Sequence, residues 1–87
     1  MILARVAGRL HSTIHHPGVR GRKILICDRL KSDGTETGGY IIALDTVGAG
    51  AGETVLILDE GSGARQILDD PTAPVRSLVV GIVDQAG

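Results

Sequence analysis

The chain has 87 residues, of which 43% are hydrophobic and 22% are charged, and its formal net charge is −1. This composition allows one domain, which we expect to span residues 1–87, and it excludes a disordered chain and a strong bulk attraction to nucleic acid or anionic lipid. The single cysteine excludes an internal disulfide framework, and the apolar runs are too short to span a membrane, so we expect a cytoplasmic protein.

Five short segments have the alternating or β-branched character of strands. They are residues 1–14, 23–28, 40–45, 53–59 and 78–83. Gly8 in the first segment and Gly81 in the last are expected to mark a bulge or a bend, as small barrels need.

Turn residues separate these segments. The Asp33-Gly34 pair predicts a turn before the third strand, and residues 48–52 form a loop in which glycine alternates with alanine. Ser62 or Gly63 is expected to cap a short helix over residues 64–68, which ends before Pro71 because the residue before a proline disfavours the helical region. Five strands and one short α-helix predict an all-β fold, a five-stranded barrel.

The chain contains one tyrosine, Tyr40, and no phenylalanine or tryptophan. The core must therefore be aliphatic. In so short a chain, the free energy gained by burying it exceeds the entropic cost of ordering the chain, about 1.5 kcal/mol per residue, by a small margin only. Burial against other copies of the chain would enlarge that margin, so the composition favours an oligomer. The lack of aromatic faces also counts against binding of single-stranded nucleic acid.

Three histidines, His11, His15 and His16, suggest a metal site by their number alone. No Cys, Asp or Glu lies within the first 26 residues to complete a ligand shell, although Cys27 and Asp28 follow directly. We therefore interpret the histidines as a polar strand end at a surface or a subunit contact, and we expect neither a metal nor another cofactor.

No pattern for catalysis is present either. Cys27 stands within an apolar run and is expected to be a small buried residue rather than a nucleophile. The loop over residues 48–52 is followed by Glu53 and a strand, whereas a phosphate loop requires Gly-Lys-Ser/Thr and a helix. Ser62 lacks the Gly-x-Ser-x-Gly turn of a hydrolase. The sequence thus predicts that the protein is not an enzyme.

Charge is distributed unevenly along the chain. The first third is basic, and most acidic residues come later; the basic residues are Arg5, Arg9, Arg20, Arg22 and Lys23. This asymmetry fits a contact between protein surfaces, a nucleic-acid patch or a solvated face. Arg65 is expected near the positive end of the predicted helix, where it either pairs with a carboxylate in this or another chain or is an ordinary solvated arginine.

Three stretches, residues 3–26, 43–56 and 61–84, together resemble the EutN/CcmL family of bacterial microcompartment shell vertex proteins. The middle stretch, Ala-Leu-Asp-Thr-Val-Gly-Ala-Gly-Ala-Gly-Glu-Thr-Val-Leu, is the most specific, and the last contains Gly-Ser-Gly-Ala-Arg followed by Val-Gly-Ile-Val-Asp. Gly63 stands where the family more often has serine. The resemblance covers nearly the whole chain.

The resemblance implies an oligonucleotide-binding-like barrel that assembles as a homopentameric ring. Such rings occupy the five-fold vertices of a shell whose facets consist of hexameric shell proteins, and they have no catalytic activity or cofactor. The expected location is the microcompartment shell within the cytoplasm, and the expected partners include neither nucleic acid nor membrane. A nucleic-acid-binding module with the same type of barrel is the alternative.

The resemblance also assigns roles to two groups of residues. The subunit interface is expected to contain Arg65 and part of the glycine-rich loop, namely Gly48, Gly50, Gly52 and Glu53. The region near the ring axis is expected to contain small residues that leave a narrow pore, namely Gly61, Ser62 and Gly63.

Overall fold

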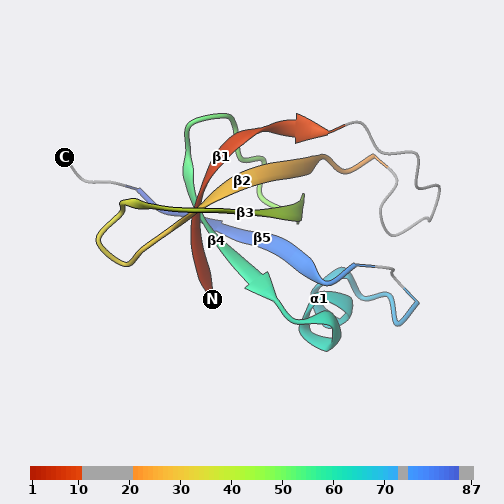
Figure 1. Ribbon diagram of the computed structural model, residues 1–87. Coiled ribbons are helices and arrows are strands. Elements are labelled where there is room, and N and C mark those ends of the chain that lie inside the picture. The colour runs from red at the N-terminus through yellow and green to blue at the C-terminus, as the bar shows by residue number, and fades with distance from the viewer. Residues whose placement is uncertain (11–20, 73–74, 85–87) are drawn as a thin grey trace.

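Five strands close into a barrel in the order β1-β2-β3-β5-β4 in this computed structural model, which describes residues 1–10, 21–72 and 75–84 (Figure 1). The elements are β1 (Ile2–Leu10), β2 (Ile24–Leu30), β3 (Glu36–Asp45), β4 (Thr54–Asp59), α1 (Gly61–Leu68) and β5 (Ser77–Ile82). The predicted five-stranded barrel with one short helix is confirmed. The three histidines lie outside the described residues.

The barrel closes through a short parallel contact. All other strand pairs are antiparallel, whereas β3 and β5 run parallel and pair at two positions, Leu44 with Leu78 and Asp45 with Val79. Within the described part of the chain, the remainder of β3 from Glu36 to Ala43 pairs with β2 alone. One edge of β3 is therefore left open over most of its length.

Two apolar clusters lie on the two sides of the sheet. The interior of the barrel is filled by small and aliphatic side chains together with Cys27; they are Ala4, Val6, Leu25, Cys27, Ala43, Ala49, Val55, Ile57 and Val79. On the outside, Ala64 of α1 packs with Leu44 and Leu78, so the helix covers the barrel where β3 and β5 meet. The expected aliphatic core is confirmed.

Both expected bends coincide with irregular pairing. The register of β1 against β2 shifts between Val6 and Gly8. The register of β4 against β5 shifts where Leu56 pairs with Gly81 and the next residue, Ile57, pairs with Val79, so that Val80 is the extra residue. These bulges increase the local bend and twist that a barrel of five strands requires.

β3 begins earlier than the sequence predicted, at Glu36 instead of Tyr40. The expected turn at Asp33 and Gly34 is tight, because Gly34 has φ 90° and the Asp33 carboxylate accepts hydrogen bonds from the backbone and the hydroxyl of Thr35 at 2.9 and 2.7 Å. Strand pairing therefore resumes directly after the turn and includes the two glycines that precede Tyr40.

The helix also begins earlier than predicted, at Gly61, and its N-cap is Glu60 rather than Ser62 or Gly63. One carboxylate oxygen of Glu60 accepts hydrogen bonds from the backbone N–H groups of Ser62 and Gly63, both at 3.1 Å. The prediction was wrong because glutamate is not a usual cap, whereas serine is.

The end of the helix lies where it was predicted, but a different residue ends it. Asp69 adopts the left-handed conformation with φ 53° and ψ 41°. The N–H groups of Asp69 and Asp70 donate to the carbonyls of Gln66 and Arg65 at 3.1 and 3.0 Å, which is the Schellman pattern. The reversal at Asp69 therefore stops the helix two residues before Pro71.

Candidate functional site

A buried carboxylate organises the glycine-rich loop between β3 and β4. Oδ1 of Asp45 accepts hydrogen bonds from the backbone N–H groups of Val47, Gly48 and Ala49 at 3.0, 3.1 and 3.3 Å. Lys23 lies 3.6 Å from Oδ2 of Asp45 and donates to the carbonyl of Ala49 at 3.0 Å. These N–H groups serve an internal carboxylate and are therefore not directed at a phosphate.

A second carboxylate holds the other end of the loop. Oε1 of Glu53 accepts from the N–H of Gly50 at 2.7 Å, and the N–H of Glu53 donates to the carbonyl of Gly50 at 3.1 Å. The N–H of Gly52 donates to the carbonyl of Val6 at 2.8 Å, which fixes the loop to β1. The loop is thus a rigid, structured surface.

Two of the loop glycines have a clear backbone requirement. Gly48 and Gly52 have φ 78° and 86°, a left-handed conformation that strains any residue with a Cβ atom. Gly50 has no such requirement, but a Cβ atom there would lie 3.4 Å from Oε1 of Glu53. All three glycines therefore support the shape of the loop.

Close approach explains the glycines of α1. A Cβ atom on Gly63 would lie 2.7 Å from Oε2 of the capping Glu60 and 3.0 Å from Leu58. A Cβ atom on Gly61 would lie 3.1 Å from the guanidinium of Arg65, which folds back over the first turn. The Gly-Ser-Gly segment thus makes room for one carboxylate and one guanidinium.

The sequence predicted Arg65 in the first turn of the helix; because the helix begins at Gly61 and not at Ala64, the backbone of Arg65 lies in the last turn instead. Its guanidinium folds back over Gly61, so the charge itself stays near the positive end of the helix. No carboxylate in residues 1–10, 21–72 or 75–84 forms an ion pair with Arg65. The pKa of Glu60 is lowered mainly by its hydrogen bond from Ser62, and the charge of Arg65 adds to this.

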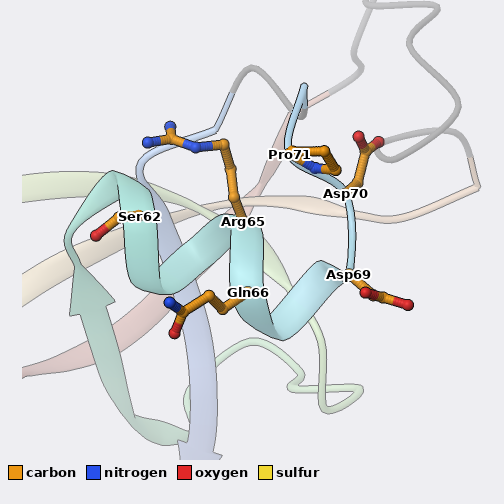
Figure 2. Close-up of a pocket in the computed structure, with 6 residues that line it drawn as sticks. All are labelled: Ser62, Arg65, Gln66, Asp69, Asp70 and Pro71. Carbon is orange, nitrogen blue, oxygen red and sulfur yellow. The ribbon is translucent and has the colours of Figure 1, made fainter.

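Arg65 lines an open hollow of about 320 Å³ on the surface of α1 (Figure 2). The other lining residues are Ser62, Gln66, Asp69, Asp70 and Pro71. Figure 2 shows Arg65 on the same side of the helix as Asp70 and Pro71, whereas Gln66 extends on the other side. This surface therefore presents a guanidinium together with two carboxylates and neutral polar groups.

The loop and the helix lie on opposite sides of the barrel. Figure 1 shows the connection between β3 and β4 (green) at the top and α1 at the bottom. β4 begins directly after the loop and ends directly before α1, and its six residues span about 20 Å. The residues predicted for the subunit interface thus divide into two separate surfaces: the loop surface, residues 46–53, and the helix surface, residues 61–71.

The described residues offer little for catalysis. Burial raises the pKa of the Cys27 thiol to about 11, with further contributions from the charges of Asp28 and Asp45, so the thiolate is strongly disfavoured. Within the described ranges, no group of three His, Cys, Asp or Glu side chains is arranged to hold a metal. No helix in these ranges is long and apolar enough to cross a membrane.

Three residues that shape these surfaces were not predicted from the sequence: Asp45, Lys23 and Glu60. Asp45 could have been found, because an aspartate before a glycine-rich turn commonly accepts hydrogen bonds from the next backbone N–H groups. Lys23 lies 22 positions before Asp45 and carries no local indication of the contact. Glu60 was not predicted as the cap because Ser62 and Gly63, which follow it, are more usual capping residues.

Comparison with known proteins gives consistent matches. The model of the family described as "Ethanolamine utilisation protein EutN/carboxysome" matches residues 1–84. The bacterial microcompartment shell vertex protein PduN of Salmonella typhimurium is 44% identical over an alignment of 88 positions, which covers 97% of this chain and 96% of that protein.

Solved structures agree with the sequence matches. The pentameric microcompartment shell protein GrpN of Rhodospirillum rubrum has a TM-score of 0.81 at 37% identity, and the match covers 100% of this chain and 98% of that one. CcmL of Nostoc sp. PCC 7120 has a TM-score of 0.82 at 41% identity, and the match covers 97% of this chain and 88% of that one.

Proposed function

Because the chain belongs to the EutN/CcmL family, we propose that it is a structural subunit of a bacterial microcompartment shell, in which a ring of five copies occupies each vertex. The observation that carries this proposal is the match along almost the whole chain to a shell vertex protein and to a pentameric shell protein. The single domain of residues 1–87 is then one unit of the ring, and its location is the shell.

Geometry gives the ring its role. A flat sheet of hexamers cannot close into a shell unless five-fold points are introduced, and a pentamer supplies such a point. The partners of the ring are therefore hexameric shell proteins, which surround it at each vertex.

The polar side chains described above support a role without catalysis. The Asp45 and Glu53 carboxylates accept hydrogen bonds from the loop backbone, and the Glu60 carboxylate accepts them from the first turn of α1. Cys27 is enclosed in the barrel. The protein shapes a surface with these groups, catalyses no reaction and binds no cofactor.

The ring contact joins two different surfaces of each subunit, since a cyclic pentamer uses heterologous contacts. The helix surface with Arg65 faces the loop surface of the next subunit, which carries Gly48, Gly50, Gly52 and Glu53. The two surfaces have opposite charges at Arg65 and Glu53, and β4 separates them within one subunit. Gly61, Ser62 and Gly63 lie near the ring axis, where small residues leave a narrow pore.

The alternative, a nucleic-acid-binding module, has no support among the relatives named above. Tyr40 is the single aromatic face available for stacking on a base. A titration with single-stranded oligonucleotides tests the alternative, and saturable binding that weakens with salt would favour it over the shell role.

Light scattering after size exclusion tests the proposal. We expect a mass close to five times the 9.0 kDa of the chain, and a clean monomer or dimer would contradict the pentamer. Arg65→Glu should weaken assembly, whereas Lys31→Glu, the same change of charge at an exposed turn residue, should not. If the Arg65 variant keeps the full mass at all dilutions, Arg65 does not belong to the contact.

A further inference from the structure

Among the described strands, β3 carries the two most exposed large apolar side chains. Tyr40, the one aromatic residue of the chain, is 64% exposed, and Ile42 is 46% exposed. Burial of these two side chains would add favourable free energy to a chain whose aliphatic core is small. Their exposure in the single subunit indicates a surface that another molecule covers.

Strand alternation places both side chains on one face. Tyr40 pairs with Asp28 and Ile42 pairs with Ile26, while the alternate residues Ala43 and Cys27 are buried in the barrel interior. The apolar outer surface continues into a hollow of about 200 Å³. We refer to Ile24, Ile26, Tyr40 and Ile42 as the β3 patch.

The backbone beside the β3 patch is also uncovered. Among the described residues, β3 from Glu36 to Ala43 forms ladder pairs on its β2 side only. Open strand edges with exposed apolar side chains promote uncontrolled association, so proteins normally cover them. The patch and the edge together require a cover of defined shape.

A hollow of about 430 Å³ lies where β4 begins and β5 ends. Residues 52–54 form one wall, and Ile82, Val83 and Asp84 form the other. Ile82 is 43% exposed and supplies an apolar surface, while Glu53 and Asp84 provide carboxylates. We refer to this feature as the β4–β5 hollow, and it adjoins the loop surface through Gly52 and Glu53.

We propose that Tyr40 of one subunit packs into the β4–β5 hollow of the next subunit, so that the β3 patch is one half of the ring contact. The aromatic ring of Tyr40 packs against Ile82 and Val83, and its hydroxyl donates a hydrogen bond to the carboxylate of Glu53 or Asp84. This inference rests on the proposed pentamer, and it adds Tyr40 and the end of β5 to the ring contact, beside Glu53 of the loop surface.

A second copy of the chain is the occupant that fits these features. A heterologous ring needs a projection on one surface and a matching recess on a different surface of the same chain. Tyr40 on β3 and the hollow between β4 and β5 meet that requirement. The hollow also extends the loop surface, so that both contacts involve the same side of the accepting subunit.

Substitution of Tyr40 tests the contact in the full chain. The mass of the unsubstituted protein is measured first, because a protein that is not pentameric contradicts the proposed function itself. In a pentamer, Tyr40→Ala should raise the subunit concentration needed for assembly by about thirtyfold or more, as for a central interface aromatic. Tyr40→Phe keeps the aromatic ring of the side chain but loses the hydrogen bond of the hydroxyl, so its effect on assembly should be smaller than that of Tyr40→Ala.

The control is Lys31→Ala, which also truncates a long, exposed side chain. Lys31 lies outside the β3 patch, the β4–β5 hollow, the loop surface and the helix surface. This variant should assemble like the unsubstituted protein. Circular dichroism establishes that each variant is folded. A folded Tyr40→Ala variant that stays pentameric to the same dilution as the unsubstituted chain would overturn the inference.

Cross-linking provides a second measurement that does not depend on weakened assembly. A chain carrying both Tyr40→Cys and Asp84→Cys, treated with a short bis-maleimide, should give a ladder of up to five linked subunits on a denaturing gel. Each single substitution should give no ladder, since Cys27 is buried. A pentameric double variant without a ladder would place Tyr40 away from the hollow and refute the contact.

Discussion

Asp45 shows how one buried side chain can determine the shape of a whole loop. Asp45 is 6% exposed, and its carboxylate accepts three backbone hydrogen bonds and lies beside Lys23. In Asp45→Ala these donors lose their acceptor, and we expect the free energy of unfolding to fall by about 3 kcal/mol. Urea denaturation at a fixed subunit concentration measures this change.

The matched control is Asp33→Ala. Asp33 also accepts hydrogen bonds within a turn, from the backbone and the hydroxyl of Thr35, but it is exposed. We therefore expect a smaller loss of stability than for Asp45→Ala. An equal loss in the two variants would show that burial of the Asp45 carboxylate is not what makes it important.

Single residues were predictable from the sequence where local backbone conformation decided the outcome. Gly48 and Gly52 were identified with the loop, and both adopt left-handed conformations. Cys27 was expected to be buried because apolar residues flank it, and it is. The contact of Lys23 with Asp45 and Ala49 depends on how β2 and the loop come together in space, so no local pattern reveals it.

At the scale of elements, α1 depends on an unusual cap. The carboxylate of Glu60 bonds to the N–H groups of Ser62 and Gly63, and these bonds and the Ser62 hydroxyl bond lower its pKa below the ordinary value of 4.5. Because its pKa is lower in the folded state, ionised Glu60 stabilises the fold at pH values above its pKa in the unfolded chain. That contribution disappears as the pH falls through the folded value.

Glu60→Gln should therefore lower the melting temperature at neutral pH, since the neutral amide is a weaker acceptor near the positive end of the helix. The difference in melting temperature between this variant and the unsubstituted chain should shrink as the pH falls below 4.5. Thermal melts followed by circular dichroism at several pH values measure it. A difference that stays constant with pH would exclude the charge of Glu60 as the cause.

The elements themselves were largely predictable, and their ends were not. Alternation located the first strand and short apolar, β-branched runs located the other four, but β3 begins at Glu36 because the turn at Gly34 is tight enough for pairing to resume at once. The helix begins at Gly61 because the long side chain of Glu60 caps the first turn. It can approach the backbone there because Gly63 has no Cβ atom. Both errors concern side chains and turns whose geometry appears only in three dimensions.

At the scale of the whole molecule, the order in which the strands pair to close the barrel could not be predicted from strand patterns. β3 and β5 meet at two residue pairs only, and this limited contact leaves the edge of β3 open. The pentameric ring was predicted from the resemblance to a family, whereas the hydrophobic composition predicted a small aliphatic core and favoured an oligomer of unspecified size. Assembly is then expected to complete what the single barrel leaves uncovered.

The stability of the subunit should consequently depend on protein concentration. When a pentamer unfolds into five separate chains, a tenfold rise in concentration stabilises each subunit by about 1 kcal/mol. For a chain of this size, that corresponds to a rise in melting temperature of about 4–8 °C. Calorimetry over a hundredfold range of concentration measures the slope.

Tyr40→Ala separates assembly from folding in this measurement. If the variant dissociates but still folds, its melting temperature should be lower and should no longer change with concentration, because its unfolding involves one chain only. A melting temperature of the unsubstituted pentamer that does not change with concentration would contradict the link between ring closure and folding. The barrel would then be stable by its own core, and the exposed face of β3 would need another explanation.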